Sequence, residues 1–542
     1  GITHLDLADA TNTGTVPTAR LGSGTASSST FLRGDGTWAT PAGGVSSDGS
    51  RNTVGGTLAG GNLSAPGAVD NTFFGHDAGG DVTTGDYNTM IGSEAGQQCT
   101  GNENTLIGSH AGYIREGNHS GTMVGYQAGY NSNSNDATHL GKKAGYNDDG
   151  TYNIYVGTEC AEGQGNGQYN IGIGYQALKY AWGGTRNGNN NIGIGKHCFQ
   201  YMLTSGYENV CMGTETGVSM TTGNHNLSIG LKAGREITTG YTNVFLGRQA
   251  GQKNTTGYNN IAMGSYAYGT GSNNKTGYNN IVIGKSAGVA ASTAHNNILM
   301  GSESCDQLTT GHNNVSLGNR TGKSITTGEN NIYMGEEAGY GAGTSNTSNN
   351  NVGIGKEAGA YISSGSYNTL VGFKAGRNVS TGSNNLLLGK IAGQSESPSG
   401  TVTTGSNIIC LGNDYITDFY CNDTSISSSD KRDKTDVTDF THGLKWVEQL
   451  KPVTYRWDKR TWYDDKTPDG SKKRARQHIG FLAQDVLAIE QADGFASKKD
   501  DMLVVNLNED DTAYGLKYER LVPVLVNAIK ELSAKVKALE AK

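Results

Sequence analysis

The sequence Thr276-Gly-Tyr-Asn-Asn-Ile-Val-Ile-Gly-Lys-Ser-Ala-Gly288 contains the unit from which most of this chain is built. The unit is an asparagine, three residues of apolar-x-apolar character, a glycine, two variable residues and often Ala-Gly. It recurs about twenty times between residues 52 and 412, mostly at intervals of 16 or 17 residues. A fixed period of this kind is typical of stacked repeats that each contact only their neighbours. Clear copies are Asn243-Val-Phe-Leu-Gly247, Asn331-Ile-Tyr-Met-Gly335 and Asn385-Leu-Leu-Leu-Gly389.

The composition also indicates a solenoid. Glycine accounts for 83 of 542 residues, and hydrophobic residues for only 34%, which is low for one large core. No proline lies between Pro66 and Pro398, as continuous backbone ladders require. Each Asn-x-x-x-Gly segment is predicted to be a short alternating strand, with the asparagine and the glycine in the corner conformations of a coil. The fold class is therefore mostly β, a β-solenoid or β-roll.

Charge, hydropathy and cysteine content exclude several classes of function. The net charge of −7 predicts no nucleic-acid binding, and no apolar run is long enough for membrane insertion. The cysteines are scattered and lack metal-ligand spacing, so we interpret them as small buried hydrophobes. We expect no metal and no cofactor. The seven are Cys99, Cys160, Cys198, Cys211, Cys305, Cys410 and Cys421.

Residues 1–45 carry short apolar anchors among small polar residues and could not bury a core alone. The phrase Phe31-Leu-Arg-Gly-Asp-Gly-Thr-Trp38 resembles the stalk segments of bacteriophage tail fibres, in which three chains intertwine. That resemblance implies that this end joins other tail proteins. The triplet Arg33-Gly34-Asp35 is interpreted as a tight turn between Leu32 and Trp38 rather than as an integrin-binding motif.

Residues 46–412 form the repeat shaft. Its pattern resembles the head domains of trimeric autotransporter adhesins, which are left-handed β-rolls that associate as trimers, although the period here is longer. Insertions in a solenoid emerge as loops on one face, often the binding face. The interval from Gly174 to Gly195 contains Tyr180 and Trp182, a candidate receptor-binding loop that could stack on a sugar. The alternative is that these aromatic residues cover the shaft or face a sister chain.

A tyrosine also recurs just before the strand. Because it follows the period, we interpret it as a structural ladder at the coil corners rather than as a row of sugar sites. These residues are Tyr87, Tyr169, Tyr207, Tyr241, Tyr258, Tyr278 and Tyr367.

After a connector at 413–429 the chain becomes rich in charge and poor in glycine, which marks a separate domain at 430–542. Its motifs are Ser429-Asp-Lys-Arg-Asp-Lys434, Lys451-Pro-Val-Thr-Tyr-Arg-Trp457 and Gly480-Phe-Leu-Ala-Gln-Asp-Val486. In combination they resemble the intramolecular chaperone domain of endosialidases, phage tail spikes and neck appendages. The resemblance implies a small α+β domain that trimerises, aligns three chains so that the shaft can fold, and then cleaves itself off.

Carried over from that family, the scissile bond is Ser429–Asp430, Ser429 is the nucleophile and Lys434 is the base. A hydroxyl needs an adjacent base, and a lysine serves as one only when burial favours its neutral form. Attack by Ser429 on its own carbonyl would close a strained ring. Attack on the Ser428 carbonyl and attack by an activated water are two other routes, and the sequence does not choose among them. Self-cleavage is the only enzymatic activity expected, with no external substrate.

A terminal helix over about 518–542 carries apolar residues at alternating intervals of three and four, which predicts a coiled coil. In isolated parallel coils β-branched residues at one core position with leucine at the other favour dimers, whereas the family resemblance implies a trimer. The seam residues are Val522, Leu525, Ile529, Leu532, Val536 and Leu539.

These observations predict a homotrimeric distal tail fibre of a bacteriophage, assembled in the host cytoplasm and carried on the virion. It would recognise a host cell-surface glycan or lipopolysaccharide. The alternative is a tail spike whose shaft degrades a polysaccharide, which requires paired carboxylates. Acidic residues of the shaft such as Glu94, Glu208 and Glu336 fall at varying repeat positions without an obvious pair. A cellular adhesin would carry a C-terminal membrane anchor, for which the sequence offers no candidate.

Overall fold

The computed structural model contains two compact units, Gly1–Gly257 and Tyr258–Lys542, which are described separately. The residues that the structure describes are 31–32, 37–39, 45–63, 67–115, 117, 119–179, 187–201, 205–269, 271, 274–341, 345–416, 418–420, 429–508 and 511–542.

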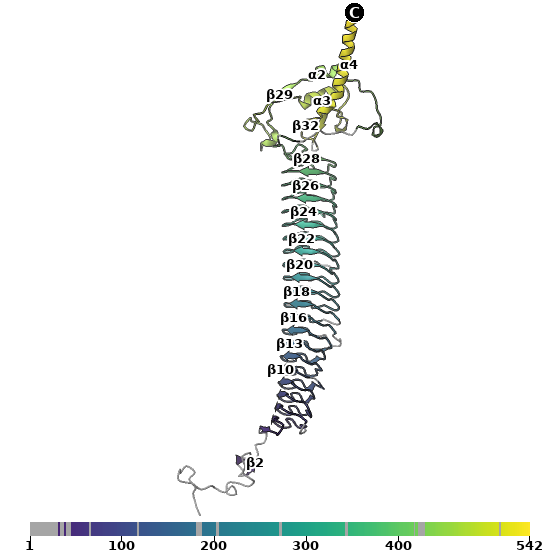
Figure 1. Ribbon diagram of the computed structural model, residues 1–542. Helices are drawn as coiled ribbons and strands as arrows, with labels where there is room; N and C mark the ends of the chain where they lie inside the picture. Colours follow the sequence, from purple (N-terminus) through teal and green to yellow (C-terminus); the bar gives the residue numbers. More distant parts are fainter. Residues whose placement is uncertain are drawn as a thin grey trace, which may run out of the picture. The chain divides into compact units, whose positions relative to one another are not determined.

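In both units the repeat forms a β-solenoid with one short strand per coil, so the predicted mostly-β solenoid is confirmed (Figure 1). Each strand pairs in parallel with the equivalent strand of the next coil. Ile332 aligns with Val352, for example, and the Ile332 N–H donates to Asn351 O at 2.8 Å. The pairing repeats in the same register at each step because the repeat length sets it.

In the first unit, β1 (Phe31–Leu32) and β2 (Trp38–Ala39) pair antiparallel. The triplet Arg33-Gly34-Asp35, predicted to form a turn, lies outside the described residues. β3 (Ser46–Ser47) then pairs antiparallel with the first coil strand. Two short side ladders join β7 (Gln98–Cys99) to β9 (Ile114–Arg115) and β12 (Asn147–Asp148) to β14 (Gln164–Gly165). The coil strands are β4 (Thr53–Gly55), β5 (Thr72–Phe74), β6 (Thr89–Ile91), β8 (Thr105–Ile107), β10 (Thr122–Val124), β11 (Thr138–Leu140), β13 (Ile154–Val156), β15 (Ile171–Ile173), β16 (Ile192–Ile194), β17 (Val210–Met212), β18 (Leu227–Ile229) and β19 (Val244–Leu246).

The second unit contains a solenoid section and the C-terminal domain. Its coil strands are β20 (Ile261–Met263), β21 (Ile281–Ile283), β22 (Ile298–Met300), β23 (Val315–Leu317), β24 (Ile332–Met334), β25 (Val352–Ile354), β26 (Thr369–Val371), β27 (Leu386–Leu388) and β28 (Ile409–Leu411).

The core of each coil is narrow. The middle residue of the strand points inward, as Tyr333 does in β24, and the alanine after the next turn, Ala338, is buried beside it. Six of the seven cysteines lie in this core as free, buried thiols, as expected; Cys421 lies outside the described residues. Several coils bury one further aliphatic residue, such as Ile325 or Ile362. A core this narrow explains why a chain with so few hydrophobic residues still folds.

A buried asparagine precedes most strands, and these residues form a hydrogen-bonded ladder from coil to coil within each unit. The Asn331 side-chain amide donates to Asn314 Oδ1 at 3.1 Å and to Ser348 O at 2.8 Å, and its backbone N–H donates to Asn314 Oδ1 at 3.0 Å. Asn331 Oδ1 in turn accepts two hydrogen bonds from Asn351. Each amide is therefore fully paired inside the coil.

This ladder corrects the predicted role of the asparagine. The left-handed backbone conformation lies one residue earlier, for example at Asn313, Asn330 and Glu208, which have φ of 57°, 58° and 55°. The repeat needs asparagine at the next position because its amide spans two neighbouring coils. The exposed residue before it varies freely.

The glycine after each strand has the predicted corner role. Gly335 has φ of 125°, and a Cβ atom there would lie 2.7 Å from the backbone of Gly355 in the next coil. A side chain would therefore push the coils apart, and glycine is required by both its dihedral angle and its contact.

A buried arginine interrupts the ladder in the first unit. Gly121 and Ala137 replace the asparagine in two coils, and Arg115 fills the space, donating to Asn104 Oδ1 at 3.1 Å and to Ser134 O at 2.9 Å. Burial lowers the pKa of Arg115, and Asp148 is a nearby compensating carboxylate. Asp148 also contacts buried His139 at 3.1 Å.

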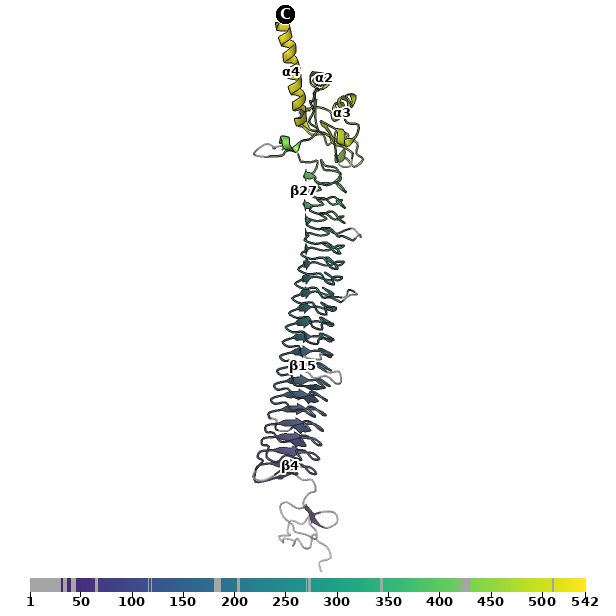
Figure 2. The ribbon, with the colours of Figure 1, turned by 90° about the vertical axis from the view of Figure 1, so that its right-hand side faces the viewer.

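The C-terminal domain contains three α-helices, labelled in Figure 2, and two small antiparallel sheets. Its buried core joins Trp446, Val486, Val505 and Val524. No described helix is long and apolar enough to cross a membrane. Its elements are η1 (Lys431–Asp433), α2 (Leu444–Gln449), β29 (Val453–Tyr455), η2 (Arg460–Trp462), β30 (His478–Gly480), α3 (Ala483–Ala492), η3 (Lys499–Asp501), β31 (Val505–Leu507), β32 (Tyr514–Leu516), η4 (Tyr518–Arg520) and α4 (Leu521–Glu540).

The asparagine ladder predicts different effects for two adjacent residues. Asn314→Ala removes the side chain that hydrogen-bonds to Asn297, Gly328 and Asn331. Each buried polar group that loses its partner lowers the free energy of unfolding by about 1–3 kcal/mol. We expect faster amide hydrogen exchange in the coils on both sides of residue 314. The matched control, Asn313→Gly, keeps the left-handed backbone and alters only an exposed side chain. Equal protection in the two variants would contradict a stabilising role for the ladder.

Candidate functional site

The first turn of the C-terminal domain is held by Asp430. Its carboxylate caps η1 by accepting from the Arg432 N–H at 2.9 Å, and it also pairs with the Arg432 guanidinium at 2.7 Å. The hydrogen bond from the Arg432 side chain lowers the pKa of Asp430, with a further contribution from the Arg432 backbone. The result is a tight, ionised turn directly after Ser429.

This turn brings the two predicted catalytic residues together. Lys434 lies immediately after η1, and its Nζ donates to Ser429 Oγ at 2.7 Å. The five-residue spacing therefore places an amine at the hydroxyl without any contribution from the rest of the domain. The geometry meets the distance requirement for a serine–lysine pair, in which a base lies within hydrogen-bond reach of the nucleophile.

Both side chains are exposed in the single chain, as are all residues from 429 to 441. In this arrangement the Lys434 amine donates a hydrogen bond to Ser429 Oγ rather than accepting one. A serine–lysine pair needs a neutral amine to act as a base. The arrangement in one chain is consequently a resting one.

Behind this turn, Asp493 ties α2 to the end of α3. It accepts from the Trp446 indole N–H, pairs with Lys445 at 3.1 Å and contacts His442 at 3.3 Å. The hydrogen bond from Trp446, followed by that from Lys445, lowers the pKa of Asp493. This carboxylate serves the packing of the domain and lies among aromatic rings.

Glu490 is a buried carboxylate that sequence reasoning missed. It accepts three backbone hydrogen bonds, from Leu503 at 3.0 Å, Val504 at 2.6 Å and Val505 at 2.9 Å. The side chain therefore fixes the start of β31 against α3. A buried charge requires partners, and these lie 13 to 15 residues further along the chain, so no local sequence signal points to them.

The predicted coiled-coil seam lies on the outer face of α4. All six seam residues are exposed, from 46% for Leu532 to 69% for Leu539. Leu521, Val524 and Ala528 lie on a different face and are buried in the domain. Asn527 donates to Phe440 O at 2.6 Å and Glu531 accepts from the Leu444 N–H, so α4 is fixed to its own domain while the seam remains free.

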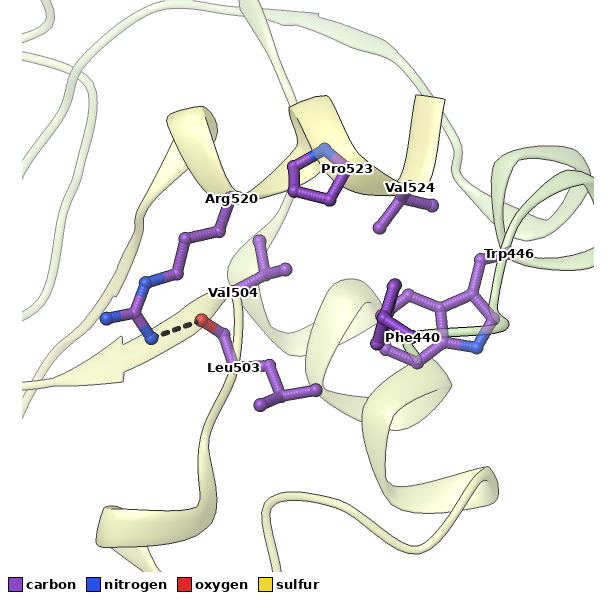
Figure 3. Close-up of a pocket in the computed structure, with 7 residues that line it drawn as sticks. All are labelled: Phe440, Trp446, Leu503, Val504, Arg520, Pro523 and Val524. Carbon is purple, nitrogen blue, oxygen red and sulfur yellow. Dashed lines mark hydrogen bonds between the residues drawn. The ribbon is translucent and has the colours of Figure 1, made fainter. Parts of the chain in front are cut away.

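A cavity of about 260 Å³ lies beneath the start of α4 (Figure 3). Apart from Arg520 its lining is apolar, and the Arg520 guanidinium donates to Leu503 O at 2.8 Å. The lining side chains include no nucleophile or general base. The residues are Phe440, Trp446, Leu503, Val504, Arg520, Pro523 and Val524.

The candidate receptor-binding loop, Tyr180 and Trp182, lies outside the described residues. The recurring tyrosines can be assessed. Tyr258 stacks on Tyr278 with ring centroids 4.9 Å apart, and Tyr152 stacks on Tyr169 at the same distance. Because these rings cover one another's faces, they offer a sugar only their edges. The stacking supports the structural interpretation of the ladder.

The acidic residues considered as glycosidase groups pair with basic side chains of neighbouring coils. Glu94 contacts His110 at 3.2 Å, Glu208 contacts His225 at 2.7 Å, and Glu336 contacts Lys356 at 2.8 Å. Hydrogen bonding to Lys356 lowers the pKa of Glu336. A glycosidase's general acid requires a raised pKa, so this carboxylate is unsuited to that role.

Two neighbouring carboxylates in the second unit have pKa values that are shifted in opposite directions. Glu303 and Asp306 both approach Lys323, at 2.6 and 3.8 Å. Hydrogen bonding to Lys323 lowers the pKa of Glu303, whereas desolvation raises the pKa of Asp306. Among the described residues, no group of three or more histidine, cysteine or acidic side chains is arranged to hold a metal ion.

Comparison with known proteins assigns the C-terminal part. Residues 429–495 match a protein-family model described as chaperone of endosialidase, and the match begins at Ser429. Comparisons with curated proteins and with solved structures gave no match.

Proposed function

We propose that this chain is the distal part of a bacteriophage tail fibre. In this proposal it is a homotrimer that recognises a host-surface glycan or lipopolysaccharide, and residues 430–542 are its removable assembly chaperone. The observation that carries the proposal is the Ser429–Lys434 hydrogen bond at the first residue of the chaperone match. The virion is the expected location, after assembly in the host cytoplasm.

Cleavage would follow trimer assembly. The seam of α4 brings three chains together, and a neighbouring chain then covers the exposed turn at Ser429 and Lys434. Burial favours the neutral amine, which accepts a proton from Ser429 Oγ or from a water beside it. The activated oxygen attacks the carbonyl carbon of the scissile peptide bond, the C–N bond breaks, and the released amine takes up the proton. Where Ser429 Oγ is the attacking oxygen, water then hydrolyses the ester that it forms. An unassembled chain stays intact because its lysine remains solvated.

The cleavage proposal is tested by the masses of the purified products. The wild-type chain should yield a fragment comprising residues 430–542, and Ser429→Ala should stay whole. Lys434→Met should also stay whole, because it keeps the length of the side chain and removes the amine. A fragment beginning at Ser429 would instead identify attack at the Ser428 carbonyl. An intact wild-type trimer after prolonged incubation would contradict self-cleavage.

Receptor binding is proposed for the shaft, at the loop that carries Tyr180 and Trp182. An aromatic ring stacked on a sugar contributes on the order of 1 kcal/mol, so loss of two rings should weaken binding about tenfold or more. The measurement is calorimetric titration with host lipopolysaccharide or capsule. Tyr180→Ala combined with Trp182→Ala should lose affinity, and Tyr367→Ala, an exposed ladder tyrosine, should not.

Incubation of the wild-type chain with the same lipopolysaccharide or capsule tests the alternative function, polysaccharide degradation. We expect binding without release of oligosaccharide. Release by the wild-type chain that is abolished by Asp306→Asn would favour a depolymerising spike, with Glu303 and Asp306 as its carboxylate pair.

A further inference from the structure

The strands of the solenoid present an outward face that stays partly exposed in the part of the chain that the structure describes. In β24 the middle residue is buried, whereas Ile332 is 38% exposed and Met334 is partly exposed. The same alternation holds along β20 to β28. Each coil thus contributes two outward side chains, and stacking converts them into two parallel rows. We call these rows the strand face.

The strand face is apolar throughout the second unit. Every outward residue of β20 to β28 is Ile, Leu, Val or Met except Thr369. In the first unit the same holds from β13 to β19, while threonine occupies the first row in the coil strands β4 to β11. No charged or amide side chain lies in either row of these described strands.

The turns that follow the strands are, by contrast, charged. There Glu336 pairs with Lys356, Glu357 with Arg377 and Glu303 with Lys323, at 2.5–2.8 Å between coils. A solvated face of a solenoid can therefore carry charged side chains in successive coils. In this chain they lie on the turns beside the strand face and not on the strand face itself. The exclusion of charge is specific to one face.

Such a surface is too large to remain exposed. A soluble monomer rarely shows a contiguous apolar patch above about 300–600 Å². Because every coil adds two aliphatic side chains, the exposed apolar area exceeds that limit within a few coils. A glycan is a poor occupant, because the rows contain hardly any side chain that can form a hydrogen bond.

Spacing identifies the occupant. Parallel strands lie about 4.8 Å apart, so each row presents one side chain per 4.8 Å over many coils. A partner must match that spacing along the whole length, and a second copy of this chain in the same register does so automatically. Two rows allow each copy to contact two neighbours, one with each row.

We propose that the strand face is the contact between copies in the shaft, with the first row of one copy packed against the third-position row of the next around a three-fold axis. This inference rests on the homotrimer proposed above. It adds which face of the coil turns inward, and it leaves the charged turns and the insertions facing outward.

The experiment places a cysteine on either side of one coil in the full-length chain, in a Cys421→Ser background. Ile332→Cys lies on the strand face, and Thr327→Cys lies on an exposed turn of the same coil. In the native protein, maleimide should label Ile332→Cys at least tenfold more slowly than Thr327→Cys. Mild oxidation should link chains covalently when Ile332→Cys is combined with Met334→Cys, because the proposed contact pairs the first row of one copy with the third-position row of the next. It should not link chains that carry Thr327→Cys. Ile332→Glu should abolish the trimer or reduce its thermal stability, and Thr327→Glu should not.

Light scattering on the wild-type chain separates the two levels of the proposal. If the wild type is a trimer but Ile332→Cys reacts as fast as Thr327→Cys, and the variant with Ile332→Cys and Met334→Cys forms no linked chains, the strand-face contact is overturned while the homotrimer stands. A monomeric wild type would overturn the homotrimer itself, and with it the assignment of this face to a second copy.

Discussion

The buried asparagine ladder is the interaction on which the solenoid depends. An amide side chain that bonds the coil before it and the coil after it fixes the distance between coils, and the glycine corners permit that distance. The ladder also makes every coil nearly equivalent to the next. A single strand and a narrow core per coil then suffice, because the amides and the parallel backbone pairing also hold the coils together.

Equivalence of the coils creates a difficulty for assembly. Three chains that pack through identical, regularly spaced rows gain almost as much when they are displaced by one coil, so the repeats by themselves define register weakly. The C-terminal domain has the opposite character. Its core is irregular, with Trp446 bonded to Asp493 and Glu490 bonded to three backbone amides. In the proposed homotrimer, a unique domain that follows the last coil and carries an exposed apolar seam on α4 would provide a fixed point from which register propagates.

Much of this architecture could be predicted from the sequence because it is periodic. The short strands, the buried cysteines, the glycine corners and the spacing that joins Lys434 to Ser429 all follow from local patterns. The role of the asparagine was predicted incorrectly, because its partners lie 17 residues away and only stacking brings them together. Arg115 takes the place of the ladder by filling the space left in two neighbouring coils. Glu490 is buried because backbone amides about 14 residues further along the chain donate hydrogen bonds to it. Neither relation has a local signal.

The central claim is that residues 430–542 set the alignment of the chains before they are removed. The most direct measurement compares the full-length chain with a chain that ends at Ser429, both expressed in the same cells and analysed by light scattering and circular dichroism. The account predicts a soluble, thermally stable trimer from the full-length chain and aggregated or misfolded material from the shortened one. A soluble trimer of equal stability from the shortened chain would contradict it.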